Sequence, residues 1–224
     1  MISDTDKKSL MTFLNELSCF SSQLEVIDRS YSQPHRRYHT LEHVKFMLDM
    51  RDKSFQSFSP TPVPMTHGDV NLIQAIVYHD IYYDSAPQSL GVNEYYSAVF
   101  AQKQGCWAEV AHAIMATGYY MVDQRVLSTL AMELCDLDLA NLALDYADYV
   151  YWSTLAIEEA MLIYFGGKAP SAVLFDGQIN FCEMMLRRKK LYYRHSEWED
   201  KARKNLHARI IELEEHPLSA DYIP

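Results

Sequence analysis

The sequence predicts an all-α, single-domain bundle of about nine or ten helices. Only 7 Gly and 8 Pro occur among 224 residues, so the turn residues that a fold of many short strands requires are scarce. Apolar residues make up 49% of the chain, and in the longer segments they recur near a period of 3.6, which is typical of amphipathic helices. The usual length of helices in compact domains then gives the expected number.

The first helix is expected over residues 6–29, where Leu10, Leu17 and Leu24 belong to an apolar series with helical spacing. The segment SQPHRRYH is expected to be a loop. Thr40 then caps, or lies in the first turn of, a helix through HTLEHVKFMLDMRD. The prolines of SFSPTPVPMTHGD predict an extended surface connection. This connection is expected to join two helices of one domain, since candidate functional residues lie on both sides of it.

The rest of the chain predicts further helices separated by turns. Asp69 opens the apolar segment VNLIQAIVYHDIYY, and Gly105 separates NEYYSAVFAQKQG from CWAEVAHAIMATG. The helix RVLSTLAMELCDLDLANLAL is expected to be interrupted near its DLD, and a turn at Gly166-Gly167 ends YADYVYWSTLAIEEAMLIYF. Two more segments, SAVLFDGQINFCEMMLRRKKLYY and SEWEDKARKNLHARIIELEEH, complete the chain. Residues 1–224 are thus expected to form one domain, with the terminal helices packed on its core.

The composition limits the location and the partners of the protein. A net charge of −10 repels phosphate backbones, so nucleic-acid binding is not expected. A small anionic substrate requires a local cation or arginines in its pocket. No apolar run reaches the roughly 20 residues of a membrane span, and four scattered cysteines without a CxxC pair are typical of reduced thiols. We expect a cytoplasmic protein without a membrane span, and the oligomeric state is left open.

His79 and Asp80 end an apolar helical segment, IVYHD. A carboxylate buried at such a position requires a partner or a cation, and both imidazole and carboxylate groups bind transition metals. The alternative is a helix C-terminal histidine favoured by the dipole, followed by an aspartate that begins a turn. The pair alone does not decide between a metal site and this local role.

Two further places in the sequence carry residues of the same chemistry. His39 and His43 are four residues apart, so both imidazoles lie on one face of a helix. The spacing is common in metal sites, although without the glutamate of HExxH it does not indicate a zincin. Two unrelated surface histidines are the alternative. Asp138, like Asp136, lies among apolar residues in CDLDLANLAL, where it is either part of a site or a helix cap.

Taken together and in order, these residues resemble the HD superfamily of metal-dependent phosphohydrolases, in which one His, a His-Asp pair and a distant Asp bind one ion. The blocks RRYHTLEHVKFML, AIVYHDIYYD, NEYYSA, CDLDLANL and ARKNL are similar to a subgroup of small predicted HD phosphohydrolases, over about residues 31–206. The resemblance implies one divalent transition metal (Mn, Fe, Co, Ni or Zn) that activates water to hydrolyse a small phosphate ester, a nucleotide or a phosphorylated metabolite. The implied ligands are His43, His79, Asp80 and Asp138.

Three residues are expected to act beside the metal. Asp84 and Glu94 are the candidate acid/base carboxylates, because a proton-transfer group has to reach the reacting water. The alternative for Glu94 is an acid at a helix N-terminus that favours the dipole. His39 is expected to support turnover rather than to bind the metal, since His43 already supplies a ligand from that helix.

Three arginines are candidate substrate ligands. Arg36 and Arg37 precede His39 and have the donor geometry to bind a phosphate bidentately, although at least one of them is expected to be a solvated loop residue. Arg203 in the block ARKNL is a third candidate, for the pocket or for a polar core position.

Two alternative functions stay open. Some HD proteins hold two irons and oxidise C–P or C–C bonds, which requires additional histidines between the His-Asp pair and the last Asp. Here His112 is the one histidine in that interval, and Tyr119 stands where the subgroup tends to carry another. The second alternative is a non-catalytic helical binding module with a structural metal.

Overall fold

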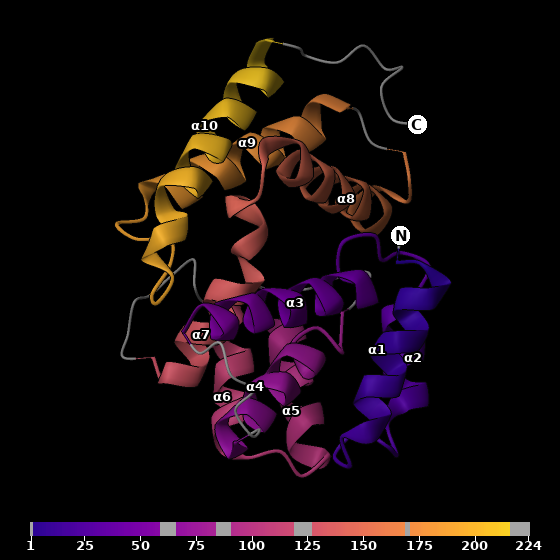
Figure 1. Cartoon of the computed structure of the whole chain (residues 1–224). Helices are drawn as coiled ribbons and strands as arrows, with labels where there is room; N and C mark the ends of the chain where they lie inside the picture. Colours follow the sequence, from indigo (N-terminus) through magenta and orange to yellow (C-terminus); the bar gives the residue numbers. More distant parts are fainter. Residues whose placement is uncertain (1, 59–65, 84–90, 119–126, 169–170, 216–224) are drawn as a thin grey trace.

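The computed structural model describes residues 2–58, 66–83, 91–118, 127–168 and 171–215. These residues form ten α-helices, two short 3-10 helices and no strand, in a single compact domain (Figure 1). The predicted fold class and number of helices are thereby confirmed. Among the described helices, none combines the length and the apolar character that crossing a membrane requires.

The first seven helices form the N-terminal half of the molecule, which occupies the lower part of Figure 1. They are α1 (Asp4–Glu16), α2 (Leu24–Tyr31), α3 (Leu41–Phe58), α4 (His67–Tyr78), α5 (Val92–Lys103), α6 (Ala108–Thr117) and α7 (Thr129–Asp138). One hydrophobic core joins them. Helix α4 lies at the centre of this core, because every residue from Leu72 to Tyr78 is buried. The end of α4 therefore delivers its next residues, the His-Asp pair, into the interior.

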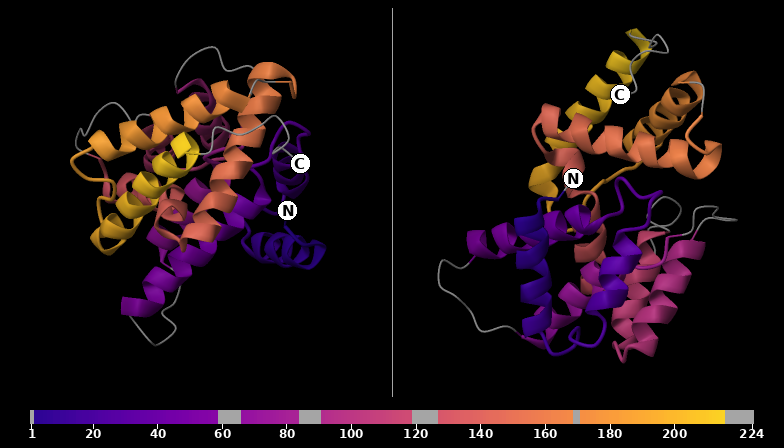
Figure 2. Two further views of the ribbon diagram at one scale, coloured as in Figure 1. Left: turned by 90° about the horizontal axis from the view of Figure 1, so that it is seen from above. Right: turned by 90° about the vertical axis from the view of Figure 1, so that its right-hand side faces the viewer.

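The remaining helices form the C-terminal half, shown from two further sides in Figure 2. The 3-10 helix η1 (Ala140–Ala143) leads from α7 into this half. It is followed by α8 (Tyr146–Phe165), α9 (Ser171–Arg187), η2 (Ser196–Trp198) and α10 (Glu199–Glu215). The buried Asn205 side chain of α10 donates hydrogen bonds to the carbonyl oxygens of Leu142 and Leu144, at 2.8 and 2.9 Å. These bonds fasten α10 to the connection between the two halves.

The predicted single helix over residues 6–29 is wrong. Helix α1 ends at Glu16, and the backbone of Leu17 is extended, with ψ near 106°. The turn that follows brings Phe20 into the core, where it has no exposed surface and its ring lies 5.3 Å from that of Tyr78. Because both helices and the turn bury apolar residues, the apolar series continues through the break.

The other predicted interruptions agree with the structure. Gly105, with φ of 83°, separates α5 from α6, and Gly166, with φ of 59°, ends α8. Both conformations are left-handed, which glycine adopts without steric cost. Helix α7 ends at Asp138, so the predicted break near DLD separates α7 from η1. Most of the proline-rich connection lies outside the described residues.

Candidate metal centre

Three helices bring His43, His79 and Asp138 together. His43 lies in the first turn of α3, His79 is the C-cap of α4, and Asp138 is the last residue of α7. Oδ1 of Asp138 lies 3.0 Å from Nε2 of His43 and 3.7 Å from Nε2 of His79. One ligand atom from each of the three residues lies within 4.8 Å of the other two. This group has the composition and spacing to bind a metal ion.

Asp80 extends the group. Its Oδ2 lies 2.8 Å from Nε2 of His79. Nδ1 of His79 faces the carbonyl oxygen of Ile76 at 2.8 Å, and because a carbonyl only accepts, Nδ1 carries a hydrogen. Within the described part of the chain, Nε2 of His79 and Oδ2 of Asp80 face each other as an ion pair, but neither atom makes a hydrogen bond of good geometry. Buried polar atoms are rarely left unsatisfied, so this nitrogen and oxygen fit the requirements of a bound transition metal.

The charges of these four residues depend on one another. Burial lowers the pKa of the His79 imidazole, but the carboxylates of Asp80 and Asp138 outweigh burial and raise that pKa well above its usual value. Burial raises the pKa of Asp80, but His79 and His39 outweigh it and lower that pKa to about 2. The pKa of Asp138 also lies well below its usual value, because contacts with His43 and His79 outweigh burial. Both aspartates are therefore ionised at neutral pH.

His39 lies beside this group, with its ring stacked on that of Tyr83 at a centroid distance of 4.0 Å. Its Nε2 lies 3.9 Å from Oδ2 of Asp80. Burial lowers the pKa of His39, but Glu159 and Asp80 outweigh it and raise that pKa. The imidazole thus faces the candidate metal ligands and carries a proton more readily than an isolated histidine.

Glu159 of α8 belongs to the centre, although the sequence analysis did not select it. Its Oε1 contacts Nδ1 of His39, and its Oε2 accepts hydrogen bonds from the backbone N–H groups of Arg37, Tyr38 and His39 at 2.8 to 3.0 Å. The side chain is 2% exposed. Burial raises the pKa of Glu159, but His39 and the backbone donors lower it to about 2. Glu159 therefore fixes the position of His39 as a buried anion.

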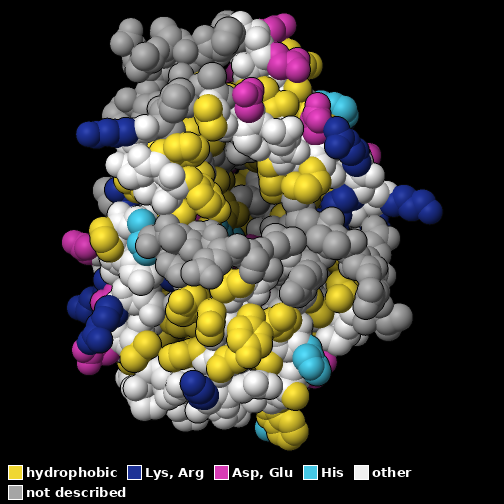
Figure 3. All heavy atoms as spheres, turned by 180° about the vertical axis from the view of Figure 1, so that it is seen from behind, with side chains coloured by type: hydrophobic (Ala, Val, Ile, Leu, Met, Phe, Trp, Pro, Cys, Tyr) yellow, Lys and Arg dark blue, Asp and Glu magenta, His cyan; other side chains and the backbone are white. Residues whose placement is uncertain are grey.

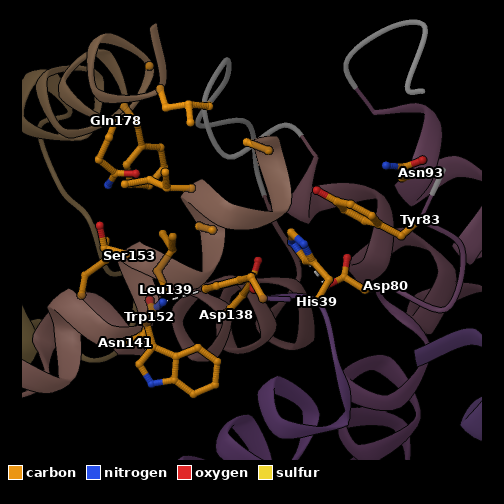
Figure 4. A pocket seen from close by; sticks show the side chains of 18 of the residues that line it. His39, Asp80, Tyr83, Asn93, Asp138, Leu139, Asn141, Trp152, Ser153 and Gln178 are labelled. Atoms are coloured by element: carbon orange, nitrogen blue, oxygen red, sulfur yellow. Dashed lines mark hydrogen bonds and ion pairs between the residues drawn. The ribbon is translucent and has the colours of Figure 1, made fainter. Parts of the chain in front are cut away.

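Asp80, Asp138 and His39 line a cavity of about 920 Å³ that lies between the two halves of the molecule. Figure 4 shows His39, Asp80 and Tyr83 at one end of this cavity, and Ser153 and Gln178 at the other. The end with His39 and Asp80 is the polar end. A molecule in the cavity can therefore reach the candidate metal centre.

Glu94 lines the polar end of the cavity from the first turn of α5. Burial raises the pKa of its carboxyl group, and the negative charges of Asp80 and Asp138 raise it further. Gly118 at the end of α6 leaves room for this side chain. A Cβ atom at Gly118 would lie 2.8 Å from Cδ of Glu94. Glu94 therefore lines the same cavity as Asp80 and Asp138.

Arg36 does not line the cavity. It is 3% exposed, and its guanidinium donates to the carbonyl oxygens of His39, Asp80 and Ile81 over 2.8 to 3.3 Å. These bonds fasten the loop before α3 to the residues after α4. This placement favours a positioning role over the predicted contact with substrate.

Arg37 and Arg203 also lie away from the cavity lining. The Arg37 side chain is exposed and donates to backbone carbonyl oxygens of its own loop. Arg203 pairs with Glu199 at 2.7 Å and donates to the carbonyl oxygen of Leu186 at 3.0 Å, which ties α10 to the end of α9. Of the places predicted for Arg203, its contacts favour the structural one.

The structure does not locate all of the residues named from the sequence. Asp84 and Tyr119 lie outside the described residues, so the structure does not place them. His112 is exposed on α6, away from the cavity lining.

Comparison with known proteins identifies no relative. No family model, no curated protein and no solved structure matches the chain. The function is therefore inferred from the cavity and the residues around it.

Proposed function

We propose that this protein is a metal-dependent hydrolase of a small phosphate ester, of the HD type that its sequence blocks resemble. The observation that carries the proposal is the convergence of two histidines and two aspartates, brought together by three helices, with their buried ligand atoms facing one another. The residues that would hold a divalent transition metal (Mn, Fe, Co, Ni or Zn) are His43, His79, Asp80 and Asp138. When bound, such an ion lowers the pKa of a water ligand and offsets charge on a phosphoryl oxygen.

His39 and Glu94 are the proton-transfer groups in this proposal. Glu159 holds His39 with Nε2 toward the cavity and favours its protonated form. His39 then donates a proton to the oxygen of the leaving alcohol. Glu94 orients the attacking water and accepts its proton, and its raised pKa suits that role, because a general base works best with a pKa near the working pH.

Phosphate-ester hydrolysis is preferred over the di-iron alternative because of the ligands that the chain offers. Among the described residues, one group of three or more candidate ligands lies close enough to share an ion. His112, which the di-iron alternative requires, is exposed on α6. A purely structural metal would leave unexplained why a large cavity adjoins the ligands and why a buried glutamate orients His39 toward it.

The proposal is tested by phosphate release. The protein is stripped with a chelator, reloaded separately with Mn²⁺, Fe²⁺, Co²⁺, Ni²⁺ or Zn²⁺, and assayed on nucleotides, sugar phosphates and simple phosphate monoesters. We expect phosphate release with at least one ion, its loss in Asp138→Ala, and its retention in His112→Ala, a matched change at an exposed histidine. No release from any substrate with any ion would contradict the proposal.

A further inference from the structure

The cavity is much larger than a phosphate group requires. At about 920 Å³, it lies near the upper end of the usual range for small-molecule sites, roughly 300–1,000 Å³. Its polar end holds His39, Asp80 and Glu94, and the rest extends between α8 and α9. The cavity therefore has room for a sizeable organic group beyond a phosphate.

The part of the cavity between α8 and α9 is lined mainly by apolar and small side chains. We name it the apolar arm, and its principal residues are Trp152, Ala156, Ala160, Leu174, Gly177 and Phe181. Figure 3 shows hydrophobic side chains around a hollow in this half of the molecule. Burial of apolar surface stabilises a complex roughly in proportion to the area removed from water. The arm thus favours an apolar organic group.

The charges around the cavity limit the number of phosphates that it can accept. Among the described residues that line it, none is Lys or Arg, and His39 is the one histidine. Asp80, Glu94 and Asp138 in the same lining are acidic. The carboxylates of Asp80 and Asp138 already offset a divalent ion, so a triphosphate would bring several unpaired negative charges into a partly buried site, at a high desolvation cost.

One unpartnered polar atom lies among the apolar side chains. Oγ of Ser153 is buried and has no hydrogen-bond partner in the described part of the chain. Ser153 lines the cavity, on the side of Gln178 in Figure 4. Because buried hydroxyl groups are normally hydrogen-bonded, this atom is an independent indication that a ligand enters the arm.

We infer that the substrate is a phosphate monoester of an uncharged, mainly apolar alcohol, whose organic group fills the apolar arm. This inference rests on the proposed function. In the reaction the oxygen of water bonds to phosphorus, the P–O bond to the alcohol breaks, and the alcohol oxygen takes a proton from His39. The products are inorganic phosphate and the free apolar alcohol.

Binding of phosphonates, which cannot be hydrolysed at the C–P bond in this way, tests the inference without depending on activity. Methyl-, butyl- and octylphosphonate are titrated calorimetrically into the metal-loaded protein. Since each buried methylene contributes about fourfold in affinity, we expect octylphosphonate to bind at least 100-fold more tightly than methylphosphonate.

Gly177→Leu is the variant that blocks the arm. A Cβ atom at Gly177 meets no atom within 4 Å, and Leu is a better helix former than Gly, so the variant is expected to fold. It should weaken octylphosphonate binding by at least tenfold and leave metal content and methylphosphonate binding unchanged. Gly177→Ala, which leaves most of the space open, is the matched control and should bind as the wild type does.

The outcomes separate this inference from the proposed function. Equal affinity for the three phosphonates, no effect of Gly177→Leu, or tighter binding of a nucleoside triphosphate than of octylphosphonate would overturn the inference. Binding that rises with chain length, without phosphate release from octyl phosphate or from any other substrate tested, would support the apolar arm and contradict the proposed hydrolysis.

Discussion

Glu159 and His39 are separated by 120 residues in the sequence, yet Oε1 of the glutamate contacts Nδ1 of the imidazole. The other oxygen of Glu159 accepts three consecutive backbone N–H groups from the loop that carries His39. One buried anion of the C-terminal half therefore sets the position and the proton affinity of a histidine that belongs to the N-terminal half. Helix α8 thus contributes to the centre although it supplies none of the candidate metal ligands.

Glu159→Gln should lower turnover while leaving the metal bound. The amide lacks the negative charge that favours protonated His39, so we expect a loss of about 10- to 100-fold, at the lower end of what an acid/base group contributes. The variant should also lose about 1.5–3 kcal/mol of unfolding free energy, typical for hydrogen bonds to a charged group. Denaturant unfolding and elemental analysis check both statements.

Glu158→Gln is the matched control, because it makes the same chemical change at the neighbouring residue, which lies on a different face of the helix. It should change neither turnover nor stability. Equal losses in the two variants would show that the effect does not arise from the contact with His39.

Gly118→Ala should act on Glu94 without touching the metal ligands. The new Cβ atom would lie 2.8 Å from Cδ of Glu94, so the flexible carboxylate has to move, whereas the helical backbone at Gly118, with φ of −72°, accepts alanine. We expect Gly118→Ala to lower turnover, as Glu94→Gln does. The loss in Glu94→Gln should reach about 10²–10⁴-fold.

Gly177→Ala is the control for steric change at a helical glycine, because its Cβ atom meets open space. If Gly118→Ala and Glu94→Gln both keep normal turnover and metal content, Glu94 is not the acid/base group. The role would then pass to another residue, and Asp84→Asn, the other candidate carboxylate, should be measured next.

The contacts of His195, which lies away from the metal centre, predict that the stability of the protein depends on pH. It is buried, its Nε2 lies 2.8 Å from Oε1 of Glu133, and its ring stacks on Trp198 at 4.1 Å. Burial lowers its pKa, but Glu133 outweighs burial with help from Glu197, so that the folded-state pKa lies above the usual 6.5. The stabilisation by protonated His195 is therefore complete below about pH 6.5 and is lost as the pH rises through the higher folded-state value.

Unfolding free energies of the wild type and of His195→Gln should therefore differ more at pH 6 than at pH 9. The comparison holds at pH 6 because Glu133, the partner of His195, has a lowered pKa and is still ionised there. His112→Gln changes an exposed histidine and is the matched control. A constant difference between wild type and His195→Gln from pH 6 to pH 9 would contradict the predicted ion pair.

The sequence predicted those features that depend on neighbours along the chain. Helical periodicity and Gly166 predicted α8, and DLD predicted the break between α7 and η1. Periodicity failed at the turn that buries Phe20, because a buried turn also carries apolar residues. Local pattern alone therefore located most helices and misjudged the first break.

In the candidate centre, too, the sequence predicted only those residues that their neighbours along the chain distinguish. His79-Asp80 was marked by its apolar helix and Asp138 by its apolar surroundings, whereas the role of Glu159 depends on a backbone segment 120 residues away. The one feature of the sequence that pointed to Glu159 was its position seven residues after Trp152, which puts both residues on the same face of the helix. The contacts of Arg36 were unpredictable for a related reason, since nothing local distinguishes a buried arginine that binds carbonyl oxygens from one that binds phosphate.

The metal content of the purified protein tests the central claim most directly. After removal of metal by a chelator and reloading with Mn²⁺, Fe²⁺, Co²⁺, Ni²⁺ or Zn²⁺, elemental analysis should find about one equivalent of at least one of these ions, because two imidazoles and two carboxylates suit such ions. His43→Ala and Asp138→Ala should lose it, and His112→Ala should retain it. Saturation should also raise the thermal midpoint, since a ligand at 100 times its Kd stabilises the folded state by about 2.7 kcal/mol. No bound metal and no thermal shift with any of these ions would contradict the account.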